Sequence, residues 1–562
     1  MSVQCAKQQL DLSFVSPFVN HATVIMNASF CCFEAVHKRR LAWLSAEGRK
    51  FGDESGWRSR SAGFQPALSR ISNPQWPRRT NRLPPRSRRY RRLETCATSA
   101  YLWPCVFSLS FFLVAASARE EVEVWLTDPD HSVLFEKQRL FLPLNSGPNS
   151  GTNVIHVDES RSFQSIDGFG YTLTGGSAMH LIRMSPPARE ALLRELFAAN
   201  GTNIGVSYLR VSIGASDLNE RVFSYDDLPP GQTDPEMKQF SLGPDLQDVV
   251  PVLKEILSIN PALKIMGSPW SPPAWMKTNG DTRGGSLKPE FYDAYARYFV
   301  CYLRAMADAG IPVDAVTVQN EPLHPGNNPS LLMQSAEQAL FIKKHLGPAF
   351  VAAGRKTKII IYDHNADRPD YPISILNDPE AAKYVDGSAF HLYAGPIEAL
   401  SEVHTAHPDK HIYFTEQWIG APGNLRGDLD WHTRTLIVGA SRNWSRTVLQ
   451  WNLAADSNYK PHTDRGGCDR CLGAVTIDGD KVKRNPAYYI IAHASKFVRP
   501  GSVRMESENS KTLPNVAFLT PQGRKVLIVL NAGASSQNLV VIWQDKNFSS
   551  VLNAGAVATY VW

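Results

Sequence analysis

From residue 166 onward, short apolar runs alternate with longer amphipathic segments. Apolar runs of strand length rich in β-branched residues predict buried strands, and the amphipathic segments predict helices. The predicted strands are residues 166–171, 205–213, 264–267, 315–319, 358–362, 387–392, 411–415 and 447–452. The predicted helices are residues 185–198, 245–259, 289–309, 335–353, 431–441 and 485–497. Such alternation indicates a parallel α/β sheet, and eight units that close on themselves give a (β/α)8 TIM barrel.

A doubly wound open sheet is the alternative architecture, but no Gly-rich phosphate-binding turn opens any predicted helix, which disfavours it. Strand-like runs separated by Gly, Pro and Asn turns occupy both ends of the remaining chain. They are residues 122–126, 153–157, 502–505, 516–519, 525–530, 539–543 and 556–562. We therefore predict an accessory β-sandwich domain built from residues 119–165 plus 499–562, beside a catalytic barrel of residues 166–498.

The N-terminal 118 residues follow neither pattern. They carry 17 Lys and Arg against 6 Asp and Glu, so the +6 charge of the whole chain leaves −5 on the remainder. A mildly acidic folded part does not suit a nucleic-acid partner. Residues 1–87 contain an Arg-, Ser- and Pro-rich stretch without a sustained apolar period. This composition predicts disorder or a mis-assigned N-terminal extension.

Residues 88–118 join a basic start, an apolar run and the small residues Ala116-Ser117-Ala118. This order predicts a secretory signal peptide, with an uncleaved membrane anchor as the alternative. We therefore expect export to the periplasm, the cell surface or the medium, without stable membrane insertion after cleavage. Cys468 and Cys471 are spaced like half of a zinc site. A second such pair is missing, so a small-loop disulfide is favoured over metal binding.

Two of the predicted strands run into a glutamate, at Glu321 and Glu416. A carboxylate at the end of an apolar strand is costly unless the site uses it. In a parallel barrel the carboxyl ends of all strands meet at one rim, where active sites lie. Two carboxylates that face one cleft are the equipment for breaking a glycosidic bond. Such hydrolysis needs no cofactor, because water and two acids suffice.

The other strand ends carry aromatic, amide and charged side chains, which suit a sugar because rings stack on its C–H faces and polar groups bind its hydroxyls. The predicted substrate-binding residues are Trp270, Asn320, Asp363, His391, Tyr393, Trp451 and Asn452. Arg210 is predicted to support the site, and Asp217 to be structural. His364 and His391 are expected to orient neighbours through hydrogen bonds, since no third metal ligand stands at a suitable spacing.

Four motifs resemble glycoside hydrolase family 30, the glucosylceramidase-like group. They are Gly168-Phe169-Gly170, the stretch Ser-Pro-Trp-Ser-Pro-Pro-Ala-Trp-Met-Lys-Thr-Asn-Gly at 268–280, Asn320-Glu321-Pro322 and Phe414-Thr415-Glu416. The resemblance covers residue 164 to the C-terminus. It implies a (β/α)8 barrel with a β-sandwich from both chain ends, and hydrolysis with retention at the anomeric carbon. It also implies Glu321 as acid/base and Glu416 as nucleophile.

Retention requires the two carboxyls at about 5–5.5 Å, whereas inversion needs about 6.5–9.5 Å. Glu416 has to be ionised to attack, and Arg210 is expected to hold the pKa of Glu416 down. Glu321 has to carry a proton, and the charge of Glu416 is expected to raise the pKa of Glu321. Asn320 is expected to hold the sugar 2-hydroxyl.

One position departs from the family pattern as we interpret it. Gly175 stands where we expect an aspartate that grips glucose hydroxyls, and Asp363 is the candidate substitute. The main hypothesis is a β-glucosidase of glucosylceramidase type that acts on a β-glucoside or glycolipid. An endo-β-1,6-glucanase acting on β-glucan is the alternative that Gly175 favours. A non-catalytic carbohydrate-binding surface protein is the alternative from another class.

Overall fold

The computed structural model describes residues 121–139, 141–147 and 153–562. The predicted extension and signal peptide lie outside these residues. Within the described part, no helix combines the length and the apolar character that crossing a membrane requires.

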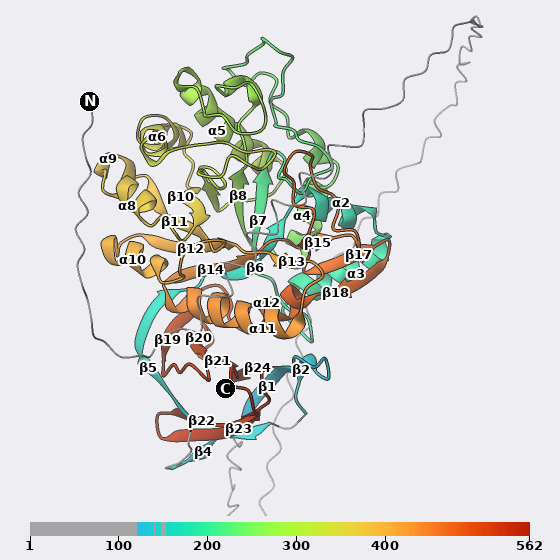
Figure 1. Cartoon of the computed structure of the whole chain (residues 1–562), viewed down its shortest axis with the longest axis vertical. Helices are drawn as coiled ribbons and strands as arrows, with labels where there is room; N and C mark the ends of the chain where they lie inside the picture. Colours follow the sequence, from blue (N-terminus) through green and yellow to red (C-terminus); the bar gives the residue numbers. More distant parts are fainter. Residues whose placement is uncertain (1–120, 140, 148–152) are drawn as a thin grey trace, which may run out of the picture. The chain divides into compact units, whose positions relative to one another are not determined.

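Eight parallel strands close into a barrel, so the predicted (β/α)8 fold is confirmed (Figure 1). Each strand pairs with the next in chain order, and the last pairs with the first. The barrel strands are β6 (Gly168–Leu173), β7 (Tyr208–Ile213), β8 (Lys264–Pro269), β9 (Ala315–Thr317), β10 (Lys358–Asn365), β11 (Val385–His391), β12 (His411–Glu416) and β14 (Ser445–Gln450).

Helical segments connect the strands, more of them than the sequence pattern predicted. The α-helices are α2 (Gly175–Arg183), α3 (Pro186–Phe197), α4 (Val249–Ile259), α5 (Tyr292–Asp308), α6 (Ser335–Phe341), α7 (Gly347–Ala352), α8 (Asp370–Leu376), α9 (Pro379–Ala382), α10 (Ala399–Ala406), α11 (Leu425–His432) and α12 (Pro486–Ser495). Short 3-10 turns are η1 (Gly243–Leu246), η2 (Ala274–Met276) and η3 (Pro289–Phe291), and π-helical segments are η4 (Ile342–Leu346) and η5 (Thr433–Ala440). Helix α2 was missed because it begins on Gly175-Gly176, a pair that usually breaks helices.

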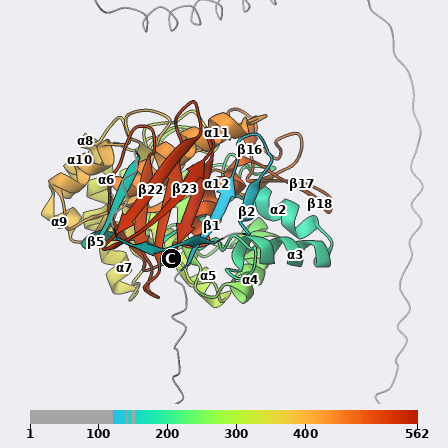
Figure 2. The same cartoon turned by 90° about the horizontal axis from the view of Figure 1, so that it is seen from below.

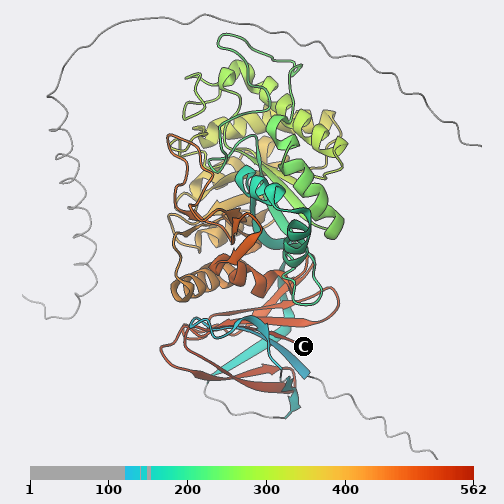
Figure 3. The same cartoon turned by 90° about the vertical axis from the view of Figure 1, so that its right-hand side faces the viewer.

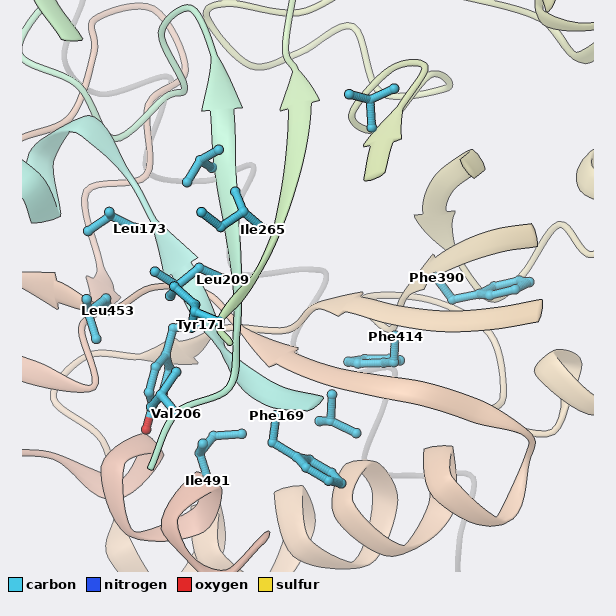
Figure 4. Close-up of a cluster of buried hydrophobic side chains, with 14 of the residues drawn as sticks. Phe169, Tyr171, Leu173, Val206, Leu209, Ile265, Phe390, Phe414, Leu453 and Ile491 are labelled. Atoms are coloured by element: carbon cyan, nitrogen blue, oxygen red, sulfur yellow. The ribbon is translucent and has the colours of Figure 1, made fainter. Parts of the chain in front are cut away.

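Strand alternation sorts side chains between the barrel interior and the surrounding helices. In β7, Leu209 belongs to the large cluster between strands and helices, whereas Tyr208 packs with six other residues in a separate small cluster. Those six are Met266, Ala315, Ile360, Ala389, Tyr413 and Leu449, each from a different barrel strand. The helix-facing layer includes Phe169, Tyr171 and Ile491 (Figure 4). The same alternation points Arg210 to the side of Tyr208, into the barrel.

Both chain ends build the second domain, as predicted. Figure 3 shows blue and dark red strands from the two ends in one separate layer. The sheet order is β2-β1-β24-β21-β20-β19-β5-β22-β23-β4, with β3 on β1. The strands are β1 (Glu121–Thr127), β2 (Leu134–Lys137), β3 (Leu142–Pro143), β4 (Asn145–Ser146), β5 (Val154–Ser165), β19 (Val503–Ser507), β20 (Asn515–Leu519), β21 (Lys525–Leu530), β22 (Gln537–Trp543), β23 (Lys546–Leu552) and β24 (Val557–Val561). Figure 2 looks onto β5, β22, β23 and β1.

The connection from β14 to α12 forms small sheets that the sequence pattern did not predict. Strand β13 (Ile419–Gly420) pairs with β16 (Cys471–Leu472). Strand β15 (Ala454–Ala455) pairs with β17 (Val475–Asp478), which forms a hairpin with β18 (Lys481–Arg484). The strands are too short to give a periodic signal. They bring residues 456–472 to the end of the barrel where β12 finishes.

A buried histidine connects α12 to the sandwich. One ring nitrogen of His493 lies 2.8 Å from the hydroxyl of Thr127 on β1, and the other lies 2.9 Å from that of Thr559 on β24. Burial lowers the pKa of His493 to about 3. The ring is therefore neutral in the folded protein, and it satisfies hydroxyls from both ends of the chain.

We expect His493→Gln to lower stability at pH 7.5 by about 1–3 kcal/mol, because a buried hydrogen bond is lost. The unfolded chain binds more protons than the folded one between pH ~6.5 and the depressed pKa of His493, so the stabilising contribution of His493 is lost as pH falls through this window. The variant should therefore lose less stability on acidification, by up to about 1.4 kcal/mol per pH unit. Urea unfolding at several pH values measures both effects. The exposed His156→Gln is the control, and equal pH slopes in wild type and variant would contradict the assignment.

Candidate active site

Arg210 is the buried centre of the site. Its guanidinium donates to Glu416 at 2.6 Å, to Asp363 at 2.8 Å and to the side-chain oxygen of Asn320 at 2.6 Å. It is fully buried, and its charged group lies 4.8 Å from the ring centre of Trp270. Charge-assisted hydrogen bonds in a dry site are strong and directional, so Arg210 fixes residues from three strand ends. The predicted contact between Arg210 and Glu416 is present.

Asp363 is the counter-charge beneath Arg210. One carboxylate oxygen accepts from Arg210 and from hydroxyls on β8 and β9, those of Ser268 at 2.7 Å and Thr317 at 2.8 Å. The other accepts from Thr415 at 2.7 Å and faces a ring nitrogen of His391 at 3.1 Å. Burial opposes ionisation, yet Arg210 and these donors hold the pKa of Asp363 well below its usual range. Both oxygens are occupied, so the hypothesis that Asp363 replaces a sugar-gripping aspartate is wrong.

His391 lies between the two glutamates. Its Nδ1 is 3.1 Å from Glu321 and 3.7 Å from Glu416, while its Nε2 faces Asp363. Burial alone would lower the pKa of His391, but the charge of Glu416 and the bonds to Asp363 and Glu321 raise it to about 10. His391 is therefore an imidazolium that donates from both nitrogens. The prediction that it orients neighbours is confirmed by these contacts.

Glu321 and Glu416 come together as predicted: their nearest carboxylate oxygens, with His391 Nδ1, all lie within 4.8 Å of one another. Tyr393 donates its hydroxyl to Glu416 at 3.0 Å. Glu321 has left-handed backbone geometry (φ 45°), and its N–H bonds to the carbonyl of Asp363, whose φ is also positive. Backbone strain of this kind gathers where a site must hold a fixed geometry.

The protonation pattern of the two glutamates differs from the one expected from the sequence. Burial raises the pKa of Glu416 despite His391 and Arg210 nearby. Burial also acts on Glu321, but His364, whose Nδ1 lies 3.8 Å away, and the hydrogen-bonded His391 at 3.1 Å lower the pKa of Glu321 below its usual range. The expectation considered the repulsion between the two glutamates and left out the imidazolium beside Glu321. Because the groups interact strongly, they titrate as one unit.

A cavity of about 310 Å³ opens onto the two glutamates. Its wall consists of Asp217, Trp270, Glu321, His324, Asn327, Asn365, Tyr393, Glu416, Trp418, Trp451, Cys468 and Cys471. Of the predicted substrate-binding residues, Trp270, Tyr393 and Trp451 are on this wall. Asn320, Asp363, His391 and Asn452 are buried and are not on it. The first three of these support the carboxylates. The side-chain oxygen of Asn452 accepts no hydrogen bond from the described residues.

The part of the cavity wall around Asp217 was the least predictable from the sequence. Asp217, which we expected to be structural, is on the wall, and burial together with the charge of Glu416 raises its pKa to about 7. Gly175 is not on the wall. A Cβ at Gly175 would lie 2.0 Å from the side-chain nitrogen of Asn219, whose oxygen accepts from Ser216 in the turn that carries Asp217. Gly175 therefore gives room to this turn.

Several wall residues gave no usable signal in the sequence. His324, Asn327 and Trp418 lie in loops after strands, and Asn365 is the last residue of β10, where polar residues are ordinary. The predicted disulfide between Cys468 and Cys471 is present, and it lies on the cavity wall. Glu321, His391 and Glu416 are also close enough to share a metal ion. Metal binding there would require His391 to lose a proton, because a ligating ring is neutral.

Comparisons with known proteins agree with this geometry. Residues 166–498 match the glycosyl hydrolase family 30 TIM-barrel domain, and residues 501–560 match the family's β-sandwich domain. The endo-1,6-β-D-glucanase neg1 of Aspergillus fumigatus is 33% identical over 451 residues, covering 75% of this chain and 90% of the relative. The lysosomal acid glucosylceramidase of Mus musculus is 31% identical over 446 residues, covering 74% and 84%.

A solved structure gives the same result. The endo-β1,6-glucanase BT3312 superimposes with a TM-score of 0.72 at 33% identity, covering 79% of this chain and 99% of that one. The barrel, the sandwich and the relatives agree with the resemblance that the sequence motifs indicated. The chain belongs to glycosyl hydrolase family 30 and is a glycoside hydrolase.

Proposed function

We propose that the protein cleaves β-glucosidic bonds with retention, by double displacement through a covalent glycosyl-enzyme. Glu416 is the nucleophile and Glu321 the acid/base. The observation that carries the proposal is the separation of their carboxylate oxygens, within 4.8 Å. Retaining enzymes place the two carboxyls about 5–5.5 Å apart, and inverting enzymes leave room for a water at about 6.5–9.5 Å.

The hydrogen bonds around Glu416 suit attack on the anomeric carbon. Arg210 and Tyr393 donate to different oxygens of this carboxylate and hold it in place. Positive charge that develops on the sugar ring favours the ionised form of Glu416. His391 lies within reach of both glutamates, so a proton can leave Glu416 and reside on the pair formed by Glu321 and His391. Glu321 then protonates the leaving oxygen and afterwards activates water.

Asp217 is the acceptor we propose for hydroxyls of the glycon. It lies on the same wall as Trp270 and Trp451, whose rings pack at 5.4 Å. A carboxylate beside an indole is a common combination for sugars, because one binds hydroxyls while the other covers C–H faces. Asp217 therefore takes the role that the sequence pattern had sought at position 175.

β-1,6-Glucan is the substrate we propose. The loop after Glu321 contributes His324 and Asn327 to the cavity, and Asn365 lies on the wall as well. These polar groups suit a sugar as the leaving group. Among the large apolar side chains of this wall, Tyr393 is exposed, and its hydroxyl donates a hydrogen bond to Glu416. The endo-1,6-β-glucanase relatives support this choice. Glucosylceramide is the second candidate, supported by the glucosylceramidase relatives.

Export is part of the proposal. The disulfide between Cys468 and Cys471 supports it, because disulfides persist in oxidising compartments. The signal peptide predicted within residues 88–118 stays a prediction.

Glu416→Gln should lower kcat on an aryl β-glucoside by more than about 10⁴-fold, since no covalent intermediate can form. Glu321→Gln should lower kcat on glucan by about 10²–10⁴-fold, and less on aryl glucosides whose leaving group needs little protonation. With azide, Glu321→Gly should give the β-glucosyl azide and Glu416→Gly the α-azide. Proton NMR of the products separates the two roles. The exposed Glu290→Gln serves as control, and a reversed azide outcome would exchange the assignments.

A substrate panel tests the leaving group. We expect linear β-1,6-glucan to be cut to short oligosaccharides, with lower kcat/KM on β-1,3-glucan and on glucosylceramide in detergent micelles. Chromatography of the products and of released ceramide provides the measurement. Comparable or higher kcat/KM on glucosylceramide would instead establish the second candidate.

Asp217→Asn should lower kcat/KM by about 10-fold or more, because a hydrogen bond to a charged acceptor contributes roughly 1.5–3 kcal/mol. Asp464→Asn, in the neighbouring loop and exposed, is the matched control. Steady-state kinetics on the aryl glucoside measures both variants. Equal loss in the two would mean that Asp217 does not bind the sugar.

A further inference from the structure

One loop lies beside Asp217 on the cavity wall and also contacts α2, where a ring nitrogen of His180 is 2.9 Å from the carbonyl of Lys460. This rim loop, residues 456–470, lies between β15 and β16. Its Thr463 N–H donates to the backbone carbonyl of Asp217 at 2.8 Å, and its Cys468 N–H donates to the Asp217 carboxylate at 3.2 Å. Among the described residues, no side chain donates a hydrogen bond to that carboxylate. The rim loop therefore contributes the donor that orients Asp217.

A covalent link fixes the position of this donor. The disulfide joins Cys468 to Cys471, the first residue of β16, which pairs with Gly420 of β13. Arg470 makes two hydrogen bonds with Ala421: its backbone carbonyl accepts from the Ala421 N–H at 2.8 Å, and its guanidinium donates to the Ala421 carbonyl at 3.0 Å. Strand β13 begins three residues after Glu416. The Cys468 N–H is thus anchored to the segment that carries the proposed nucleophile.

The sulfur atoms are also part of the sugar-facing surface. Cys471 is buried in a small cluster with Leu218, Trp270 and Trp451, and Cys468 packs against the same cluster. Both cysteines are on the cavity wall. The disulfide therefore packs against the Trp270 and Trp451 cluster and also positions the Cys468 N–H that donates to Asp217.

We propose that the Cys468–Cys471 disulfide is a positioning element for sugar recognition, which holds the Asp217 carboxylate and the adjoining indoles in the arrangement that binds the glycon. The inference rests on the proposed function, because it deepens the role of Asp217. Its physical basis is that a short covalent loop removes alternative conformations of the 468–471 segment before substrate arrives.

A pH signature follows from the same contact. The Cys468 N–H favours the ionised form of Asp217, so its loss should raise the pKa of Asp217 above its value of about 7. The groups that face Asp217 are Glu416 from β12, Glu321 after β9 and Tyr393 after β11. Glu416 is held by hydrogen bonds from Arg210 and Tyr393, which do not involve the rim loop, so we expect it to keep its position when the disulfide is removed. A shift confined to the Asp217 limb therefore reports the lost contact rather than general loosening.

The test compares the full-length protein with Cys468→Ser/Cys471→Ser on an aryl β-glucoside. We expect kcat/KM to fall about 10-fold, mainly through KM, because one hydrogen bond to a charged group is lost. In the pH profile of kcat/KM, the limb near pH 7 that reports Asp217 should shift to higher pH. In an Asp217→Asn background the same double substitution should alter kcat/KM less than about 2-fold, because the disulfide and Asp217 affect sugar binding through the same carboxylate.

Two further variants guard against trivial explanations. Cys301→Ser removes a free cysteine of α5 and should leave the kinetics unchanged. Arg470→Ala loosens the rim loop without touching sulfur, and should raise KM in the same direction but less. Thermal unfolding of each variant shows whether it is folded. An unchanged KM in folded Cys468→Ser/Cys471→Ser, or an equal loss with and without Asp217, would overturn the proposal.

Failure of the proposed function would be distinguishable. If the wild type cleaves neither aryl glucoside nor glucan, the proposed function is wrong. Calorimetric titration with 1-deoxynojirimycin, a glucose-shaped amine, then decides the positioning role by itself. A Kd about 10-fold weaker without the disulfide would support it, and an equal Kd in the two proteins would overturn it.

Discussion

The site depends on one buried ion pair, Arg210 with Asp363. Burying a guanidinium and a carboxylate is costly unless each finds enough partners, and here every oxygen of Asp363 accepts hydrogen bonds from side chains of other barrel strands. The pair is thus a device for fixing strand ends relative to one another. Glu416, Asn320 and His391 all take their positions from it. Removing either charge would leave the other buried with one charged partner fewer, since Arg210 would keep Glu416 and Asp363 would keep His391.

The barrel, the sandwich and the two glutamates were predictable because each leaves a local trace. Strand-length apolar runs predict the β units. A carboxylate directly after such a run indicates a functional site, because burying its charge costs free energy. Helix α2 and the small sheets around β16 were not predictable, because a Gly-Gly start and two-residue strands leave no period. The protonation pattern was also missed, since it depends on His391, whose distance to Glu321 only the fold determines.

Asp217 and Gly175 show why a position-by-position comparison of motifs is unsafe. Gly175 drew attention as a missing acceptor, although its role is to leave room for Asn219, whose side-chain nitrogen would lie 2.0 Å from a Cβ at this position. Asp217 seemed ordinary, since an aspartate in a loop after a strand is usually solvated. In the structure Asp217 lies on the cavity wall, whereas Gly175 does not and only leaves room for the neighbouring turn. A glycine can therefore belong to a binding site by leaving room for the turn that carries the ligand-binding side chain.

The pairing of β1 with β24 carries a consequence for biogenesis. The strand nearest the amino end of the described chain finds its hydrogen-bonding neighbour among the very last residues, Val557–Val561. Residues 557–561 must therefore be synthesised and leave the ribosome before β24 can cover this edge of β1. Until then β1 pairs with β2 on one side and exposes unpaired backbone groups on the other, and a stop codon before residue 557 would leave that edge uncovered. Such a truncated product would keep an open sheet edge with unpaired N–H and C=O groups.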